Sequence, residues 1–192
     1  SYVVTWDSNA QDGSQGGIYA QRFANNGEAL GAEFRVNTLV NGDQSWAQIA
    51  ALSDGGFVIS WQDSAGNDGS GWGSYAQRFD AGGNQLGGEF LVNGSVISSQ
   101  YQPAVTALAS GGFVVSWYND YYDASGTGSA ADVYVREYAA DGSPVGAEVK
   151  VNSPSGSYYQ YEPAIAHLGS DNFVVVWRSD GQDGSNAGIY QQ

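Results

Sequence analysis

A short apolar run that ends in tryptophan occurs four times along the chain at nearly constant spacing. Over 113–117 it alternates Phe, Val and Trp with Val and Ser. The four closing tryptophans are 55, 56 and 60 residues apart, at Trp6, Trp61, Trp117 and Trp177. A fixed period of this length is typical of tandem repeats, in which one unit is too small to bury a core alone. We therefore expect a single repeat array over 1–192, with units of about 1–44, 45–100, 101–160 and 161–192.

Each unit divides into four short segments separated by glycine, asparagine and aspartate, a pattern typical of antiparallel strands joined by tight turns. We name these segments the Pro, Trp, Tyr and Glu strands. In the third unit they are Pro103–Leu108, Phe113–Trp117, Val133–Tyr138 and Glu148–Asn152. Along this order the side chains change from small and apolar, through bulky and apolar, through mixed, to charged.

This gradient predicts an all-β fold, a β-propeller with four-stranded blades whose Pro strand lies innermost and whose Glu strand lies outermost. We expect the Trp strand to be buried on both faces and the Tyr strand, which carries Arg22, to be partly buried. The proline is expected at the start of its strand, where a ladder donor is dispensable. A β-solenoid is the alternative. The first unit lacks a Pro strand and the last lacks a Glu strand, so we expect a fragment of a larger propeller or repeat protein.

The composition disfavours several classes of function. Twenty acidic residues against six basic ones give a net charge of −14, which disfavours nucleic-acid binding. The apolar runs are too short to insert into a membrane. The absence of cysteine excludes disulfides and thiolate metal sites. A secreted protein of this kind needs another stabiliser, for which calcium is the candidate cofactor.

The loops after the Trp strands hold the candidate calcium ligands. An aspartate follows each tryptophan by six or seven residues, at Asp12, Asp68, Asp123 and Asp183. Three of these loops carry another oxygen-bearing side chain three residues earlier, at Asn9, Asp120 and Asp180. Such oxygens, with a serine hydroxyl and loop carbonyls, are the hard ligands that calcium prefers. The alternative is that the aspartates form Asx turns with their own backbone.

Aromatic residues outside the repeat are the candidate ligand-binding residues. The repeat tryptophans themselves are expected in the core. Clustered loop aromatics near carboxylates suit the faces of sugars. The candidates are Trp46, Trp72, Tyr121, Tyr122, Tyr158 and Tyr159, with Tyr161 beside them.

The repeated glutamates are expected to be structural. Glu33, Glu89 and Glu148 recur at equivalent positions, whereas a glycosidase needs two carboxylates in different environments. We expect them to pair with Arg22, Arg78 or backbone at a blade edge. A lone His167 cannot supply a catalytic triad or a three-histidine zinc site.

The repeat resembles those of very large secreted bacterial calcium-binding or RTX-type adhesin proteins. The resemblance rests on Gly-Gly-Phe-Val-Val-Ser-Trp, Asp-Gly-Ser, Gly-Ile-Tyr-Ala-Gln-Arg-Phe and the later Glu and Val-Asn positions, and it covers the whole chain. It implies a secreted or cell-surface protein and calcium binding. The glycine-rich nonapeptides of the RTX calcium roll are absent, and the resemblance implies no catalytic residue.

From these observations we expect a non-enzymatic extracellular module for adhesion or scaffolding. Its partners would be a cell-surface glycan or protein, or other segments or copies of the same protein. A carbohydrate-binding, lectin-like propeller is the first alternative. A glycan-degrading enzyme is the second, disfavoured because no single acid and base stand out from the repeats.

Overall fold

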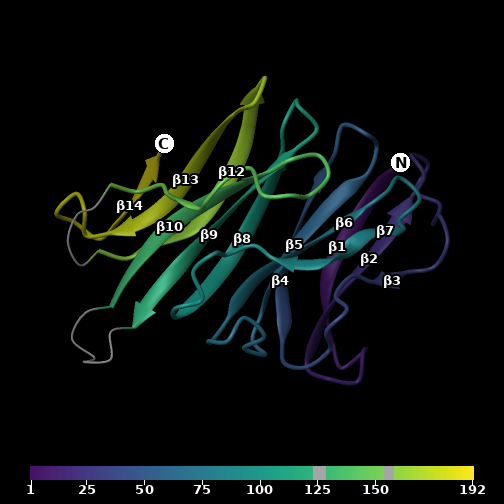
Figure 1. Cartoon of the computed structure of the whole chain (residues 1–192), viewed down its shortest axis with the longest axis horizontal. Coiled ribbons are helices and arrows are strands. Elements are labelled where there is room, and N and C mark those ends of the chain that lie inside the picture. The colour runs from purple at the N-terminus through teal and green to yellow at the C-terminus, as the bar shows by residue number, and fades with distance from the viewer. Residues whose placement is uncertain (123–128, 154–157) are drawn as a thin grey trace.

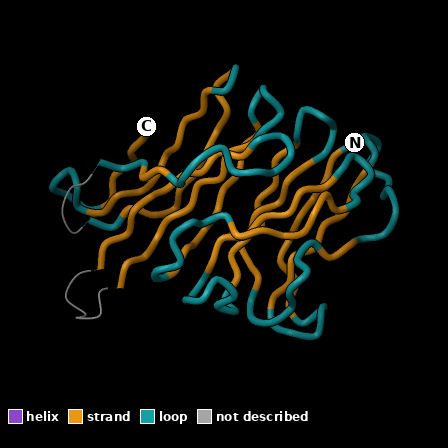
Figure 2. The backbone as a smooth tube through the Cα atoms, viewed as in Figure 1, coloured by secondary structure: helices purple, strands orange, loops and turns teal. Residues whose placement is uncertain are grey.

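The protein consists of strands and loops arranged as four antiparallel sheets that follow one another from the N-terminal to the C-terminal end of the molecule (Figure 1). The computed structural model describes residues 1–122, 129–153 and 158–192, apart from the side chains of 121, 122 and 129. Within these ranges no residue is helical, so no helix there spans a membrane. The loops gather at the ends of the strands (Figure 2).

Each sheet is a meander in which strands adjacent in sequence pair with one another. The first sheet contains β1 (Tyr2–Asn9), β2 (Gly16–Phe23) and β3 (Phe34–Arg35). The second contains β4 (Gln44–Ala51), β5 (Phe57–Asp63), β6 (Gly73–Phe79) and β7 (Gln85–Leu91). The third contains β8 (Ser99–Ala107), β9 (Phe113–Tyr122), β10 (Ser129–Tyr138) and β11 (Val149–Lys150). The fourth contains β12 (Gln160–Gly169), β13 (Asn172–Asp180) and β14 (Ala187–Gln191).

This arrangement confirms the all-β prediction and the order of the strands. The Pro, Trp, Tyr and Glu strands of the second unit are β4, β5, β6 and β7, paired in that order. The repeat tryptophan pairs across the sheet with the repeat tyrosine, and their rings stack at 6.4 Å for Trp61 and Tyr75 and at 6.1 Å for Trp117 and Tyr134. Each unit of the sequence therefore contributes one sheet.

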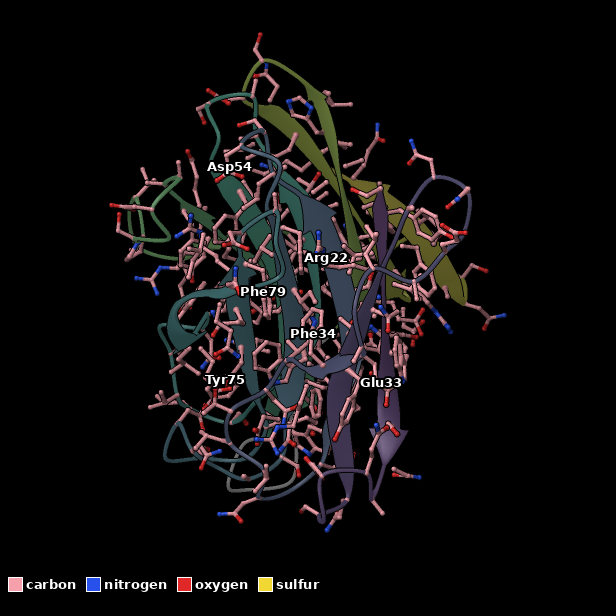
Figure 3. All side chains as sticks on the ribbon, turned by 90° about the vertical axis from the view of Figure 1, so that its right-hand side faces the viewer. Arg22, Glu33, Phe34, Asp54, Tyr75 and Phe79 are labelled. Atoms are coloured by element: carbon pink, nitrogen blue, oxygen red, sulfur yellow. The ribbon has the colours of Figure 1, made fainter. Side chains whose placement is uncertain are left out.

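The core lies between successive sheets. An aliphatic face of one sheet packs against an aromatic face of the next: Ile18 and Val36 of the first unit pack with Trp61 and Phe79 of the second. Figure 3 views the molecule from the side of the first sheet and shows Phe34 beside Phe79, whose ring centroids are 5.5 Å apart. The same arrangement recurs between the second and third sheets and between the third and fourth.

The repeat tryptophans are core residues wherever a preceding sheet covers them. Trp61, Trp117 and Trp177 are 1%, 0% and 5% exposed. Trp6 is only half-buried, because none of the sheets formed by the described residues packs on its face of the first sheet.

Two predictions about individual strands need correction. The predicted partial burial of the Tyr strand holds for Arg22 in β2 and for β10, where buried and partly exposed residues alternate, but it is wrong for β6. The Tyr strand is completely buried in β6, where even Arg78 is buried, because its stem packs against Gly142 of the third unit and its guanidinium donates to the Asp141 carbonyl at 2.6 Å. The Pro strand begins three or four residues before the predicted position. Pro103 therefore lies within β8, in a bulge where the ladder needs no donor.

Candidate active site

The first strand of each of the last three sheets carries a β-bulge at the same position of the repeat. The pairing shifts between Ser45 and Gln48 in β4, between Tyr101 and Ala104 in β8, and between Tyr161 and Ala164 in β12. The residue within each bulge has a positive φ, of 63° at Trp46, 50° at Gln102 and 53° at Glu162. Strained non-glycine residues of this kind cluster at functional sites, and bulges re-aim side chains there.

A side chain from the preceding sheet supports the first two bulges. The Asp7 carboxylate accepts from the backbone N–H groups of Trp46 and Ala47 at 2.9 and 3.2 Å. Gln62 accepts from the N–H of Gln102 at 2.9 Å. Asp7 and Gln62 both directly follow a repeat tryptophan. The corresponding residue of the third sheet is Tyr118, so the repeat is broken between the third and fourth sheets.

Aromatic side chains form a row across this break. Successive ring centroids are 5.8 Å apart for Trp72 and Tyr101, 5.4 Å for Tyr101 and Tyr118, and 6.5 Å for Tyr118 and Tyr161. The Arg178 guanidinium lies 4.9 Å from the centre of the Tyr161 ring. We call Trp72, Tyr101, Tyr118 and Tyr161 the aromatic row.

Two carboxyl groups lie beside the aromatic row in one cavity. Asp120, near the end of β9, and Asp180, at the end of β13, line a cavity of about 360 Å³ together with Tyr118, Tyr159 and Tyr161. A neighbouring cavity of about 600 Å³ shares Tyr159 and Asp180 with the first. Asp180 therefore lines two adjacent cavities, each of which has enough volume for a small ligand.

The two carboxyl groups have different environments. Asp120 Oδ1 is buried and has no hydrogen-bond partner within the described residues, and burial raises the pKa of Asp120. Asp180 accepts a hydrogen bond from the Tyr161 hydroxyl at 2.8 Å and lies 3.6 Å from Arg178 Nε. Burial, with the charge of Asp120 as the next cause, raises the pKa of Tyr118 to about 12, so this hydroxyl stays protonated.

Among the described residues, another carboxyl group with a raised pKa and another cavity lack this combination. Burial also raises the pKa of Asp63, but its two oxygens accept from the Ala65 N–H and the Gln44 amide at 2.7 and 3.1 Å. A cavity of about 270 Å³ between the first and second sheets is lined by Arg22, Ile49 and Phe57 and has no carboxylate in its wall. Neither offers an acid and a base to a ligand.

The candidate calcium ligands do not gather into one metal site. Asp12, Asp68 and Asp183 each accept a hydrogen bond through Oδ1 from the serine N–H two residues later, at 3.0, 3.1 and 3.0 Å. These are the Asx turns given as the alternative. Asn9 is exposed at the end of β1, and Asp123 lies outside the described residues. Among the residues that the structure places, no three His, Cys, Asp or Glu side chains are grouped to hold a metal. Calcium binding stays a prediction.

The structure brings some of the candidate aromatic residues to this site. Trp72 belongs to the aromatic row and Tyr159 lines both cavities, whereas Trp46 is 47% exposed at its own bulge. Tyr158 is 36% exposed and lies against Gly181. Tyr121 and Tyr122 are in β9, but their side chains lie outside the described part of the chain.

Sequence reasoning missed Tyr101, Tyr118 and Arg178. For Tyr118 and Arg178 the signal was a departure from the repeat. The residue after the tryptophan is Asp7 and Gln62 in the first two units, but Tyr118 and Arg178 in the last two. It also missed that Asp120 and Asp180 line one cavity, because they are distant in sequence.

Two of the three repeated glutamates bind backbone of the preceding unit, one of the roles predicted for them, whereas Glu33 accepts a hydrogen bond from the Gln11 side chain of its own unit at 2.6 Å. Glu89 accepts from the N–H groups of Thr38 and Leu39 at 2.6 and 3.2 Å. Glu148 accepts from those of Gly94 and Ser95 at 2.7 and 3.2 Å. We call these the glutamate–backbone contacts.

Comparison with known proteins gives the fold. No protein-family model matches this sequence, and no curated protein sequence matches it. Among solved structures, a protein of unknown function from Dyadobacter fermentans superposes with a TM-score of 0.65 at 12% identity, over 92% of this chain and 55% of its own. An α-L-arabinofuranosidase from Fusarium graminearum, solved with an iminosugar inhibitor, gives 0.58 at 13% identity over 97% and 58%. A Penicillium chrysogenum α-L-arabinanase, solved with arabinobiose, gives 0.55 at 13% identity over 99% and 70%.

The comparison favours the propeller over the solenoid and corrects the expected class of function. The arabinofuranosidase and the arabinanase are β-propellers, so the chain has a propeller-like fold. It spans between about half and 70% of the length of these three proteins. The expectation of a non-enzymatic adhesion or scaffolding module was wrong, because the arabinofuranosidase and the arabinanase that share this fold are glycoside hydrolases. The repeated pattern led to this error because it drew attention to what the units share.

Proposed function

We propose that this chain belongs to a propeller-type glycoside hydrolase and that Asp120 and Asp180 are its catalytic pair. The observation that supports the proposal is the placement of two carboxyl groups from neighbouring sheets in one cavity, in unlike environments. Glycosidases use such a pair, in which one carboxyl group acts as general acid and the other as base or nucleophile.

The different environments of Asp120 and Asp180 give the two carboxyl groups different catalytic roles. Asp120, whose pKa is raised by burial, holds the proton and gives it to the oxygen of the departing sugar. Asp180 acts as the carboxylate on the other side of the scissile bond, oriented by the Tyr161 hydroxyl. Arg178, which lies over Tyr161 and close to Asp180, holds this arrangement in place.

Sugar binding follows from the surroundings of the pair. Tyrosine and tryptophan rings stack on the apolar faces of sugars, and the aromatic row supplies such rings from the second to the fourth sheet. The cavities on the two sides of Asp180 provide places for the sugar residues that flank a scissile bond.

We infer that the four sheets are blades of a propeller with a period of about 56 residues. The innermost strands β4, β8 and β12 are then next to the axis, and their bulges aim side chains towards the ligand. The strand order in each sheet and the exposed outer strand β7 support this arrangement.

The proposal is tested by incubating the protein with a panel of neutral polysaccharides, arabinan included, and measuring released reducing ends. We expect cleavage by the wild type and a loss of about 100-fold or more in Asp120→Asn and in Asp180→Asn. Asp141→Asn is the matched control, because Asp141 accepts from Ser143 in an exposed outer hairpin and asparagine can keep that turn. Unchanged cleavage in both site variants would refute the assignment.

A lectin-like function is the second candidate, since the aromatic row alone would bind a glycan. It would show as binding to the same polysaccharides without release of reducing ends, lost in Tyr118→Ala and kept in Asp120→Asn.

A further inference from the structure

The N–H groups of the β-bulges are matched to acceptors from the preceding sheet in the second and third units. In β4 both bulge residues have an N–H group, and Trp46 and the residue after it donate to one carboxylate oxygen of Asp7 each. In β8 the second bulge residue is Pro103, which has no N–H group. The N–H of Gln102 donates to the amide oxygen of Gln62. Each bulge therefore receives one acceptor oxygen for each of its donors.

The bulge of β12 keeps the donor but lacks the acceptor. Its pairing shift and the φ of 53° at Glu162 match those of the other two bulges, so the N–H of Glu162 is turned towards the third sheet in the same way. The next residue is Pro163, which leaves Glu162 as the donor of this bulge. The repeat places Tyr118 where Asp7 and Gln62 provide their oxygens. No side-chain oxygen in the described part of the chain accepts from the Glu162 N–H.

The cavity beside Asp120 lies where this acceptor is missing. Its walls include Tyr118 from the third sheet and Tyr161, the residue before Glu162, from the fourth. Glu162 is exposed, so a ligand can approach its backbone. Backbone N–H groups need a hydrogen-bond partner, and convergent polar groups in a cavity fix the orientation of a ligand. An oxygen atom of a ligand in this cavity can supply the missing acceptor.

We propose that the backbone N–H of Glu162 binds an oxygen atom of the ligand, which takes the position that Asp7 and Gln62 oxygens take in the other two bulges. Asp120, Asp180 and the Glu162 side chain make the surroundings acidic, so the bound atom is a neutral oxygen, such as a sugar hydroxyl, and not a carboxylate. That the ligand is a glycan rests on the function proposed above, whereas the open N–H group does not.

Amide hydrogen exchange, measured for each residue by NMR, tests whether this N–H is open. After correction for the local sequence, we expect the Glu162 N–H of the wild type to exchange roughly five-fold or more faster than the Gln102 N–H, because a side-chain hydrogen bond protects only the latter. Gln62→Leu removes that bond and should abolish the difference. Equal protection of the two N–H groups in the wild type would overturn the proposal.

Substitution of Tyr118 should produce the opposite change. Tyr118→Gln restores the side chain that the repeat has in the second unit, so the Glu162 N–H should become protected and the ligand should bind more weakly. Tyr118→Leu is the matched control, because it loses the same ring but offers no acceptor, and its Glu162 N–H should exchange as in the wild type. Circular dichroism checks that both variants keep the fold. Equal exchange at Glu162 in the two folded variants would contradict the proposal.

Arabinan is the probe for the ligand itself, added to Asp120→Asn so that it stays uncleaved. Bound arabinan should slow exchange at Glu162 by roughly five-fold or more. Arabinan that protects the N–H of Tyr159, another residue of the cavity wall, and leaves Glu162 unchanged would refute the proposal. Failure of the proposed hydrolase function would be seen differently, as arabinan that protects Glu162 but is not cleaved by the wild type.

Discussion

Asp120 combines two properties that seldom occur together without a functional reason. Its Oδ1 is buried without a partner among the described residues, and it lines a cavity beside a second carboxylate. Removing a carboxyl group from water without a hydrogen-bond partner lowers the free energy of unfolding. Residues of this kind are candidates for catalysis because the same desolvation adjusts their proton affinity.

The first prediction concerns the stability of Asp120→Asn. Because the folded-state pKa of Asp120 is raised, the folded protein disfavours its ionisation, and stability falls as pH rises from about 3.9 through the folded-state value. Asparagine does not ionise. The variant should therefore have a higher Tm than the wild type at pH 7, by roughly 2 °C, a shift that corresponds to under 1 kcal/mol in a domain of this size.

The difference should disappear below about pH 4, where aspartate is protonated in both states. Circular dichroism melting curves at the two pH values measure it. A variant less stable than the wild type at pH 7 would show that Asp120 makes stabilising contacts instead.

The calcium prediction is tested at the aspartate loops. The Asx turns occupy Oδ1 of Asp12 and leave its Oδ2 without a hydrogen-bond partner in the described part of the chain. If these loops bind calcium, a chelator should lower the Tm by several degrees and excess calcium should restore it, since a ligand stabilises the state that it binds. An unchanged Tm in the chelator would rule out stabilisation by calcium.

At the scale of elements, side chains that reach across from one sheet to the next join the sheets. The glutamate–backbone contacts run from the outer strand of one unit back to the preceding unit, whereas Arg22 and Arg78 reach forward to the Gly82 and Asp141 carbonyls at 2.6 Å. These polar contacts surround the apolar interface and fix its register.

A third prediction follows for Glu89→Ala. The change removes the acceptor for the N–H groups of Thr38 and Leu39, which water then satisfies because the contact is exposed. We expect a loss of about 1 kcal/mol in the free energy of unfolding, measured by urea titration. Glu137→Ala serves as control, since the described residues offer its exposed side chain no hydrogen bond or ion pair, and it should change stability by less than about 0.5 kcal/mol.

The strand order could be predicted from the sequence, but details of the strands could not. The polarity of the side chains in each strand of a repeated unit indicates which strand lies at an exposed edge. The structure agrees, because β7 is an edge strand of its sheet and is mostly exposed. Pro103 appeared to begin a strand because a bulge is set by pairing with β9, which the local sequence does not reveal. The charge of Arg22 led to the prediction of a partly exposed Tyr strand, whereas the long stem of its equivalent Arg78 allows complete burial in β6.

The site was less predictable than the fold for a related reason. Asp120 and Asp180 were chosen as ligands within their own loops, whereas the structure pairs them between sheets. Tyr118 and Arg178 are strand residues that break the repeat, and the prediction concentrated on what the repeats share. Comparing equivalent positions for differences would have pointed to them.

At the scale of the whole molecule, the charge of −14 bears on the substrate. Arg178 is partly neutralised by Asp180, with Glu162 at 3.9 Å as a further acidic neighbour. The site is therefore surrounded by negative charge, which repels acidic glycans and leaves neutral ones unaffected.

The fourth prediction is a difference in salt dependence. Raising the salt from about 0.01 M to about 0.3 M shortens the Debye length from about 30 Å to under 10 Å. Cleavage of a neutral polysaccharide should change less than about two-fold, while binding of a polyuronate should strengthen because repulsion is screened. Parallel assays over this salt series measure both. Polyuronate binding that weakens with salt would indicate a positively charged site and contradict the prediction.

The glutamate–backbone contacts do not depend on the side chains of the residues whose N–H groups donate to the glutamate. Glu89 binds main chain at Thr38 and Leu39, and Glu148 binds main chain at Gly94 and Ser95, although these pairs have little in common. The receiving positions can therefore drift during evolution, and a whole unit can be duplicated in tandem, without loss of the joint between neighbours. Selection is then free to change the few positions at which one unit differs from the next.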